Sequence, residues 1–194
     1  TDESVILVAD SGENAIVSTA GASASLPVQD VLAAIDAMAS GDLLVMQGNL
    51  GRTLTEAALR HADERGLVTL LNPAPVAFAY QGLLELVDIA VVNAVEAATL
   101  GPLPTPTVIV TDGPNGAHLL RGEAALHVPA PDMAAVDTSG AGDVVCGVVA
   151  AGLAQGLPLP AALRRAVAAA SLKVTRAGAF AGLPRAAELE SLRP

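Results

Sequence analysis

Towards its C-terminal end the chain reads Val136-Asp137-Thr138-Ser139-Gly140-Ala141-Gly142-Asp143, and a long apolar run follows. The small residues in this stretch let backbone N–H groups approach a ligand closely. The apolar run predicts a helix, and the partial positive charge at its N-terminus makes the loop suitable for holding an anion. Asp143 would repel a phosphate group, so it makes better sense as a base that takes a proton from a neighbouring hydroxyl.

Two other interpretations of this loop stay open from the residues alone. The glycines could form only a tight turn, with Asp143 capping the helix. The loop could also belong to a dinucleotide-binding motif, but that motif has a third glycine and follows the first strand of its domain. Here the third glycine is missing and the loop lies late in the chain.

The composition excludes several classes of protein. Apolar residues make up 52% and charged residues 15% of the 194 residues, which excludes intrinsic disorder. Aromatic residues make up 2%, so a base-stacking platform is not expected. The net charge of −10 repels nucleic acid and anionic membranes, and we expect neither as a partner. The single cysteine, Cys146, and the lack of a signal peptide predict a cytoplasmic protein.

Two further features have structural interpretations. Residues 144–163 carry no charge, but a Gly-Leu-Pro sequence at 156–158 interrupts the run. We therefore expect a buried helix that ends at Gly156 rather than a membrane span.

The three histidines, His61, His118 and His127, are scattered and match no metal-ligand spacing.

Strands and helices alternate through the middle of the chain. Expected strands cover residues 4–9, 15–18, 43–46, 68–71, 89–92, 108–111, 117–120 and 125–128. Expected helices cover residues 27–39, 53–65, 83–87, 143–155 and 160–175. Fully apolar strands are typical of a parallel sheet that is covered on both faces. The pattern therefore predicts a single α/β domain, with the hairpin at 4–18 outside the main sheet.

Six segments, in order, resemble the ribokinase/PfkB family of carbohydrate and nucleoside kinases. The glycine loop resembles the family signature Asp-Thr-x-Gly-Ala-Gly-Asp. The other five segments are 8–16 (VADSGENAI), 44–47 (LVMQ), 72–75 (NPAP), 88–96 (DIAVVNAVE) and 175–179 (TRAGA). The resemblance implies a ribokinase-like α/β fold with a central, mostly parallel sheet flanked by helices. It also implies that residues 1–20 are part of a β lid and that residues 21–194 form the nucleotide-binding domain.

This resemblance implies an ATP-dependent kinase that phosphorylates the terminal hydroxyl of a pentose, converting D-ribose to ribose 5-phosphate. Asp143 would be the catalytic base and would contact the sugar together with Asn49. The backbone of Gly140, Ala141 and Gly142 would form an anion hole. The family motif Thr-x-Gly-x-x-Gly matches residues 111–116. The implied ATP-binding residues are Asn93, Thr111, Asp112, Gly113, Pro114, Asn115, Gly116 and Gly142.

The resemblance also implies two cations and a dimer. Asn93 and Glu96 match a motif that binds Mg²⁺ largely through water, although taken alone they predict a strand-end cap and a first-turn acid. A monovalent cation, K⁺, would be held mostly by backbone carbonyls. The matching residues are Asp137, Ser139, Lys173, Arg176, Gly178 and Gly182. The lid would pair two copies of the chain in a homodimer.

The chain departs from the family pattern in four places. The family's N-terminal third, which carries an Asp and a glycine pair that grip the sugar, has no counterpart here. The link at 97–110 is shorter than the family's, and its Gly-Pro-rich part at 101–106 is unsuited to a helix. Asn49 stands where ribokinases have a sugar-binding Glu, and Val167 stands where they often have a polar residue near the adenine.

These departures leave three functional hypotheses. The first is the ribokinase-type kinase. The second is another member of the family that acts on a different sugar or on a nucleoside. The third is a non-catalytic fragment that binds nucleotide but has lost the sugar side of the site.

Overall fold

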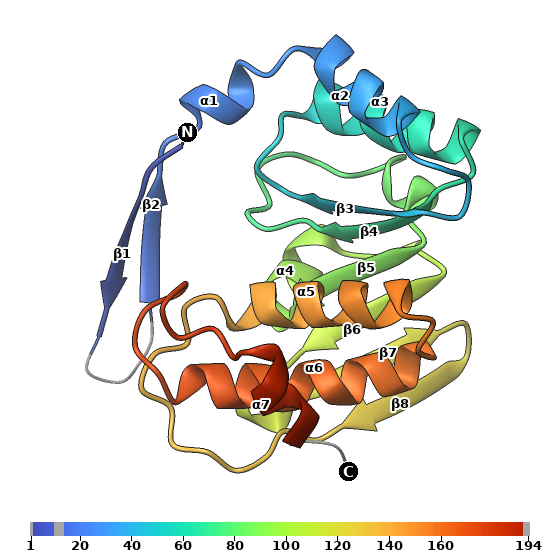
Figure 1. Ribbon diagram of the computed structural model, residues 1–194. Coiled ribbons are helices and arrows are strands. Elements are labelled where there is room, and N and C mark those ends of the chain that lie inside the picture. Colours follow the sequence, from blue (N-terminus) through green and yellow to red (C-terminus); the bar gives the residue numbers. More distant parts are fainter. Residues whose placement is uncertain (1, 10–13, 192–194) are drawn as a thin grey trace. The chain divides into compact units, whose positions relative to one another are not determined.

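A computed structural model describes residues 2–9 and 14–191 (Figure 1). Its strands are β1 (Ser4–Val8), β2 (Asn14–Ser18), β3 (Leu43–Gln47), β4 (Val68–Asn72), β5 (Ile89–Asn93), β6 (Thr107–Thr111), β7 (Ala117–Arg121) and β8 (Ala124–Val128). Its α-helices are α1 (Gly21–Ala24), α2 (Val28–Asp36), α3 (Arg52–Glu64), α4 (Ala94–Leu100), α5 (Ala141–Ala154), α6 (Leu159–Val174) and α7 (Ala186–Ser191). Two short 3₁₀ helices, η1 (Leu84–Leu86) and η2 (Gly113–Asn115), complete the elements.

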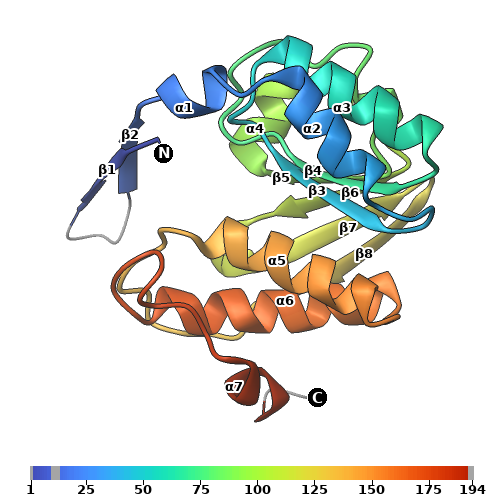
Figure 2. The same ribbon diagram turned by 45° about the horizontal axis from the view of Figure 1, so that its top comes forward.

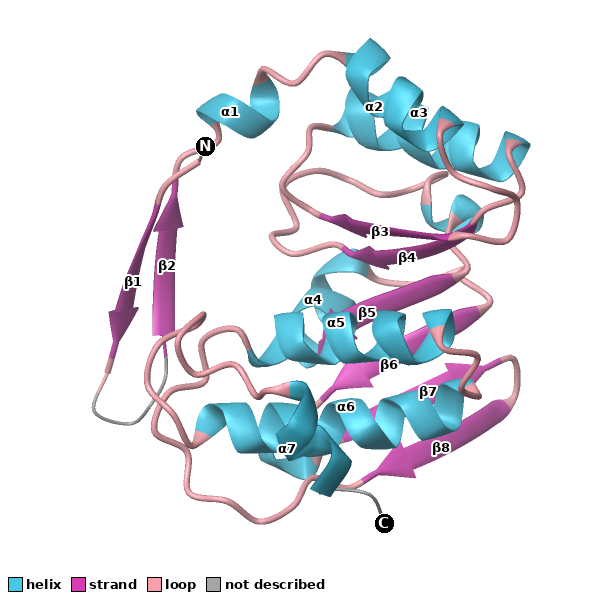
Figure 3. Ribbon diagram, in the orientation of Figure 1, coloured by secondary structure: helices cyan, strands magenta, loops and turns pink. Residues whose placement is uncertain are grey.

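The central sheet has six strands in the order β3-β4-β5-β6-β7-β8. Strands β3, β4 and β5 run parallel, with Leu43 opposite Val68 and Leu70 opposite Ile89. The arrows of β7 and β8 run in opposite directions, so the sheet is mixed (Figure 3). This arrangement confirms the predicted ribokinase-like α/β class, with a sheet flanked by helices.

The chain forms two compact units. Of the described residues, the first comprises 2–3, 19–110 and 120–124, and the second comprises 4–9, 14–18, 111–119 and 125–191.

The first unit is built around the amphipathic helix α3. Leu54, Ala58, Leu59 and Ala62 recur at helical spacing and are buried, whereas Arg60 lies on the exposed side. Ala58, Leu59 and Ala62 join a core that includes Ile35 of α2 and Leu71 of β4. Burial of each large aliphatic side chain contributes about 1.5–3 kcal/mol, so this face holds α2, α3 and the parallel strands together. Helices α2 and α3 lie side by side in Figures 1 and 2.

The second unit contains the packed helix pair α5 and α6, which lie side by side in both views (Figures 1 and 2). Their contact is close because Gly152 of α5 faces Ala162 of α6, and a Cβ at Gly152 would lie 2.8 Å from the Ala162 Cβ. The apolar run at 144–163 breaks at residues 155–158 between the two helices, as the sequence predicts. Among the residues that the structure describes, no helix has the length and apolar character to cross a membrane.

Strands β1 and β2 form the predicted antiparallel hairpin, with Ser4 opposite Ser18. The hydroxyl groups of these two serines lie 2.7 Å apart. The sequence predicts a turn over residues 10–14; residues 10–13 lie outside the described residues, and Asn14 is the first residue of β2. The hairpin exposes Val5, Leu7 and Val17, which are 62%, 62% and 68% accessible to solvent. These are large apolar side chains that the described part of the chain leaves uncovered.

The predictions from the sequence omitted short helices but no strands. Every predicted strand is confirmed, and the long helices differ from the expected bounds mainly at α2, which ends at Asp36 rather than Ala39. The helix expected at 83–87 is the 3₁₀ turn η1. Helices α1 and α7 were not expected, because segments of 4 and 6 residues are too short to show an apolar periodicity. The link at 97–110 begins with the last turn of the seven-residue helix α4, which ends at Leu100 and was not predicted. Residues 101–106 are non-helical, as their prolines predict.

Candidate functional site

The glycine loop before α5 is anchored to the end of α6. The N–H groups of Val136 and Asp137 donate to the carbonyl oxygen of Val174 at 2.7 and 3.1 Å. The Asp137 carboxylate accepts hydrogen bonds from the N–H groups of Ser139 at 2.9 Å and Gly178 at 2.7 Å. The loop is therefore held in one conformation by segments that lie far apart in the sequence.

These bonds stabilise the charged form of Asp137, which is buried. The Ser139 N–H is the largest cause that lowers the pKa of Asp137, and its pKa falls from 3.8 to about 2. The Ser139 hydroxyl also contributes, although it lies outside regular hydrogen-bond geometry. The N–H of Gly178 and the more distant Lys173 ammonium lower the pKa further. Asp137 therefore supports the loop as a carboxylate acceptor.

Gly140 is where the loop turns into α5. Its φ is +80°, a left-handed backbone conformation that glycine adopts readily and that residues with a Cβ rarely adopt. A Cβ at this position would also lie 3.3 Å from the carbonyl oxygen of Ala179. Among the described residues no hydrogen bond uses the N–H of Gly140 or Gly142, whereas the N–H of Ala141 donates to Thr138 O at 3.2 Å. The predicted anion hole therefore has two N–H groups available, and Ala141 contributes through its small size.

Asp143 lies in the first turn of α5, close to the two available N–H groups. The Asp143 residue is exposed to solvent, but nearby protein atoms remove part of the hydration of its carboxylate. This desolvation raises the pKa of Asp143 above 3.8. In the described parts of the chain, no hydrogen bond or ion pair engages the Asp143 carboxylate. It can accept a proton from a bound hydroxyl, and a raised pKa favours that transfer near neutral pH.

The turn between β6 and β7 is closed by backbone hydrogen bonds. The N–H of Asp112 donates to Gly116 O at 2.8 Å, and the N–H of Gly116 donates to Gly113 O at 3.1 Å. Gly116 has a φ of +99°, and a Cβ there would lie 2.1 Å from the carbonyl oxygen of Val128. Only glycine allows the turn to pack this closely against the end of β8.

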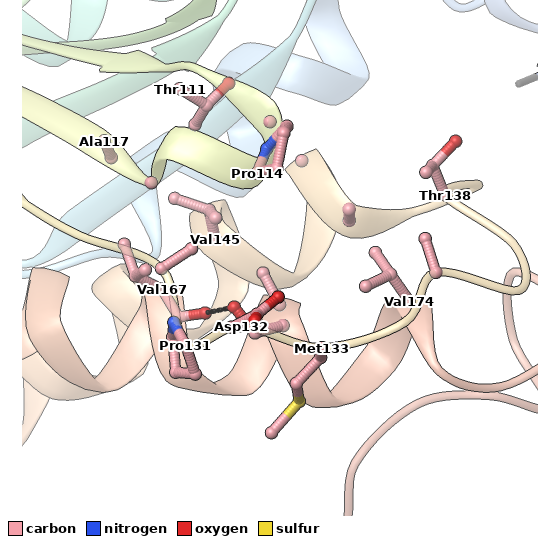
Figure 4. A pocket seen from close by; sticks show the side chains of 18 residues that line it. Thr111, Pro114, Ala117, Pro131, Asp132, Met133, Thr138, Val145, Val167 and Val174 are labelled. Atoms are coloured by element: carbon pink, nitrogen blue, oxygen red, sulfur yellow. Dashed lines mark hydrogen bonds between the residues drawn. The ribbon is translucent and has the colours of Figure 1, made fainter. Parts of the chain in front are cut away.

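A cavity of about 280 Å³ brings this turn together with the glycine loop (Figure 4). Gly113 and Gly116 of the turn line it, together with Thr138, Ala141 and Gly142 of the glycine loop. Most of the other lining side chains are apolar, and they come from α5, α6 and the loop before α5. The full lining is Thr111, Gly113, Pro114, Gly116, Ala117, Ala130, Pro131, Asp132, Met133, Ala135, Thr138, Ala141, Gly142, Val145, Val167, Ala170, Ser171 and Val174.

Part of the cavity lining was not predicted from the sequence. Residues 130–135 form an extended loop, and its Pro131, Asp132 and Met133 line the cavity (Figure 4). No motif, charge pattern or periodicity marks this segment in the sequence. Val167, which was expected near an adenine, does line the cavity, and Asp112 and Asn115 do not.

A family model described as pfkB family carbohydrate kinase matches residues 2–186. The chain belongs to the pfkB family of carbohydrate kinases. It is 29% identical over 195 residues to the ribokinase of Bacillus subtilis, an alignment that covers 96% of this chain and 67% of that protein. It is therefore a ribokinase-like sugar kinase, a phosphotransferase with an alcohol group as acceptor.

Solved structures agree with this family assignment. The crystal structure of ribokinase from Thermotoga maritima has a TM-score of 0.84 and 27% identity, covering 98% of this chain and 69% of that one. The ribokinase of Arabidopsis thaliana, solved with ribose and ATP, has a TM-score of 0.82 and 23% identity, covering 99% and 66%. At that identity the second comparison supports the fold alone. The pfkB-family chain described here spans about two thirds of the length of these relatives.

Three predicted site residues of this pfkB-family kinase lie in the first unit. Asn49 is exposed just after β3, where Gly48 packs so tightly that a Cβ would lie 2.4 Å from Pro75 O. Asn93 and Glu96 form a capping box at the start of α4. The side chain of each accepts a hydrogen bond from the backbone N–H of the other at 2.8 Å. The prediction made from these two residues alone, a strand-end cap and a first-turn acid, is confirmed.

The capping box is compatible with a water-mediated Mg²⁺. It uses Asn93 Oδ1 and Glu96 Oε2, so the second carboxylate oxygen of Glu96 takes no part in it. Mg²⁺ keeps much of its hydration shell and is usually bound by one or two carboxylates together with substrate phosphates. Within residues 2–9 and 14–191, no group of three or more His, Cys, Asp or Glu side chains could form a protein cage for a metal ion. The donor set therefore fits an ion that arrives with the nucleotide.

The residues predicted to bind a monovalent cation do not fit one. The ammonium group of Lys173, fully buried, donates to the carbonyl oxygens of Asp137 at 2.9 Å and Arg176 at 3.5 Å. The carbonyl oxygen of Gly178 accepts from the N–H of Gly182 at 2.9 Å. A second cation would share the carbonyl oxygens of Asp137 and Arg176 with an ammonium. Two positive charges about 4 Å apart repel by about 4 kcal/mol at an effective dielectric constant of about 20.

Proposed function

We propose that this kinase transfers the γ-phosphoryl group of ATP to the terminal hydroxyl of a pentose, and that D-ribose is its substrate. The observation that carries the proposal is the cavity in which the Gly113–Gly116 turn meets the glycine loop at the N-terminus of α5. The relative from Bacillus subtilis is named a ribokinase, which supports ribose and ATP as the substrates here.

The cavity suits the base of the nucleotide. Its lining is mainly apolar, with Val145, Val167 and Val174 among the larger side chains, and burial of a planar ring against such a surface is favourable. The phosphates would then extend towards the N–H groups of Gly140 and Gly142, where the start of α5 favours negative charge. The Thr111–Gly116 turn would border the nucleotide.

Asp143 would supply the chemistry at the acceptor. Its carboxylate takes the proton of the terminal sugar hydroxyl as that oxygen attacks the γ-phosphorus, and the bond from the γ-phosphorus to the β–γ bridging oxygen breaks to release ADP. Gly140 and Gly142 would bind the transferred group, so that positioning and charge stabilisation provide most of the rate. Mg²⁺ held through water near Asn93 and Glu96 would neutralise phosphate charge.

The acceptor is less constrained by the structure than the nucleotide. Asn49 offers hydrogen bonds but no charge where ribokinases have a carboxylate, so a related acceptor such as a deoxypentose, another sugar or a nucleoside is the second candidate. The hairpin of β1 and β2 would act as a lid near the acceptor. Its exposed Val5, Leu7 and Val17 suit pairing with a second copy of the chain, which is the basis for proposing a homodimer.

The test is ADP release on a panel of acceptors: D-ribose, 2-deoxy-D-ribose, D-fructose and adenosine. We expect the highest kcat/KM with D-ribose. A preference for another acceptor would replace ribose by that acceptor and leave the kinase assignment in place. Nucleotide binding with no acceptor-dependent ADP release would support a non-catalytic nucleotide-binding protein and reject the proposed activity.

A further inference from the structure

The most unusual group in the second unit is the ammonium of Lys173. A lysine side chain is almost never fully buried unless its charge is paired. The side chain of Lys173 has 0% of its surface exposed. Its Nζ lies 2.9 Å from Asp137 O, 3.5 Å from Arg176 O and 3.9 Å from the Asp137 carboxylate. The charge is therefore compensated by backbone carbonyls and by one carboxylate, which is the environment that proteins provide for a bound cation.

The position of this ammonium links two segments. Asp137 lies in the glycine loop that leads to α5, and Arg176 lies in the segment that follows α6. Lys173 itself lies in the last turn of α6, where the helix dipole favours a positive charge. The same two segments are joined a second time by the bond from the N–H of Gly178 to the Asp137 carboxylate at 2.7 Å.

The side chain of Arg176 takes no part in this arrangement. Its guanidinium pairs with Glu188 of α7, with Nη2 and Oε1 2.5 Å apart. The Glu188 carboxylate holds the arginine, and only the Arg176 carbonyl points to Lys173. Lys173 is thus the cation that contacts the glycine loop from the side of α6.

We propose that the Lys173 ammonium does in this kinase what a bound monovalent cation would otherwise do. It orders the glycine loop and the 176–182 segment from inside the protein, and it makes nucleotide binding and phosphoryl transfer independent of K⁺. Lys173 is a positioning residue, because it acts through the loop and touches no reacting atom. The part that concerns transfer rests on the proposed function, whereas the ordering of the loop does not.

The first test uses the unmodified protein. Its thermal unfolding midpoint and its ADP dissociation constant are measured in KCl, NaCl and choline chloride at equal ionic strength. We expect dissociation constants that agree within about twofold. A saturable increase in affinity or unfolding midpoint that K⁺ produces and choline does not would overturn the proposal.

The second test replaces the charge. Lys173→Met keeps an unbranched side chain of similar length and removes the ammonium, and Arg164→Met removes a charge from the exposed side of the same helix as a control. Hydrogen exchange is read at the amides of Ser139 and Gly178, which bond to Asp137. We expect exchange at these amides to accelerate by about tenfold or more in Lys173→Met, with partial recovery in K⁺ but not in choline.

The outcomes of the second test are distinct. Exchange at Ser139 and Gly178 that matches the unmodified protein would show that the ammonium orders nothing and would contradict the proposal. Faster exchange that K⁺ leaves unchanged would show a packing role rather than a cation role, and would also contradict it. Should Lys173→Met not fold, Lys173→Arg retains the charge and is expected to exchange at the rate of the unmodified protein in choline. None of these readouts requires kinase activity.

Discussion

The carboxylate of Asp137 and the backbone N–H of Gly178 form a hydrogen bond of 2.7 Å that joins the glycine loop to the segment after α6. Because the same carboxylate also accepts from Ser139, its two oxygens fix both ends of this junction. The conformation of the loop, and with it the direction of the N–H groups at the start of α5, therefore depends on the buried charge of Asp137.

Replacing Asp137 by Asn is expected to lower stability by about 1–3 kcal/mol at neutral pH, because buried donors lose a charged acceptor. The pKa of Asp137 is about 2 in the folded protein and 3.8 ordinarily, so its contribution is present above 3.8 and is lost as the pH falls towards 2. The stability difference between the two proteins should therefore shrink over that range in urea unfolding. A difference that stays constant would show that the charge is not responsible, and Asp63→Asn on the exposed side of α3 is the control.

The turn at Gly116 offers a second prediction. Gly116→Ala would place a Cβ 2.1 Å from Val128 O, so the turn must open and the cavity must change shape. We expect a large loss of stability and of ADP affinity, measured by urea unfolding and calorimetric titration. Gly122→Ala at the tip of the β7–β8 hairpin is the matched control, because its φ of +58° is also positive but a Cβ there would meet nothing within 4 Å. Equal effects of the two substitutions would mean that backbone strain alone, rather than the close approach, matters.

Two glycines of α5 should respond in opposite directions. Gly152→Ala would bring a Cβ to 2.8 Å from Ala162 Cβ and force α5 and α6 apart, at a cost of about 1–3 kcal/mol. Gly147→Ala meets nothing within 4 Å and should stabilise the helix by about 0.5–1 kcal/mol. Denaturant midpoints measure both. If Gly152→Ala were also stabilising, the close packing of the two helices would be refuted.

Much of the fold could be predicted because its signals are local. The apolar strands such as 43–46, the hairpin around Gly122 and the break after Gly156 each follow from neighbouring residues, and the structure confirms them. The short helices α1 and α7 could not be predicted, since neither spans two full turns. The capping box of Asn93 and Glu96 follows from their spacing of three residues alone.

The site was less accessible to sequence reasoning. The glycine loop and the turn at Gly116 could be recognised from their motifs, but the wall supplied by Pro131 and Met133 depends on how a featureless loop packs. The interpretation of Lys173 depends on geometry in the same way. The family resemblance implies that Lys173 is one of the residues that hold a monovalent cation. The structure shows that the Lys173 ammonium itself bonds to two of the predicted carbonyl oxygens, those of Asp137 and Arg176. A position match cannot show where a long side chain ends.

The raised pKa of Asp143 makes the rate of phosphoryl transfer depend on pH. A base acts in its deprotonated form, so kcat/KM should fall as the pH is lowered through the pKa of Asp143, at a pH above 3.8. ADP affinity measured over the same range should not follow this profile, because the nucleotide does not need the carboxylate. A rate profile that is flat down to pH 3.8 would contradict the role of Asp143 as the base.

The most direct test of the central claim compares Asp143→Asn with the unmodified protein in two assays, acceptor-dependent ADP release and nucleotide titration. Asparagine keeps the shape of the side chain and cannot accept the proton, so we predict that kcat falls by about 10²–10⁴-fold while the ATP dissociation constant stays within about threefold. Loss of transfer and of nucleotide binding together would show that Asp143 only supports the structure of α5. Full activity in the variant would show that the proton goes elsewhere.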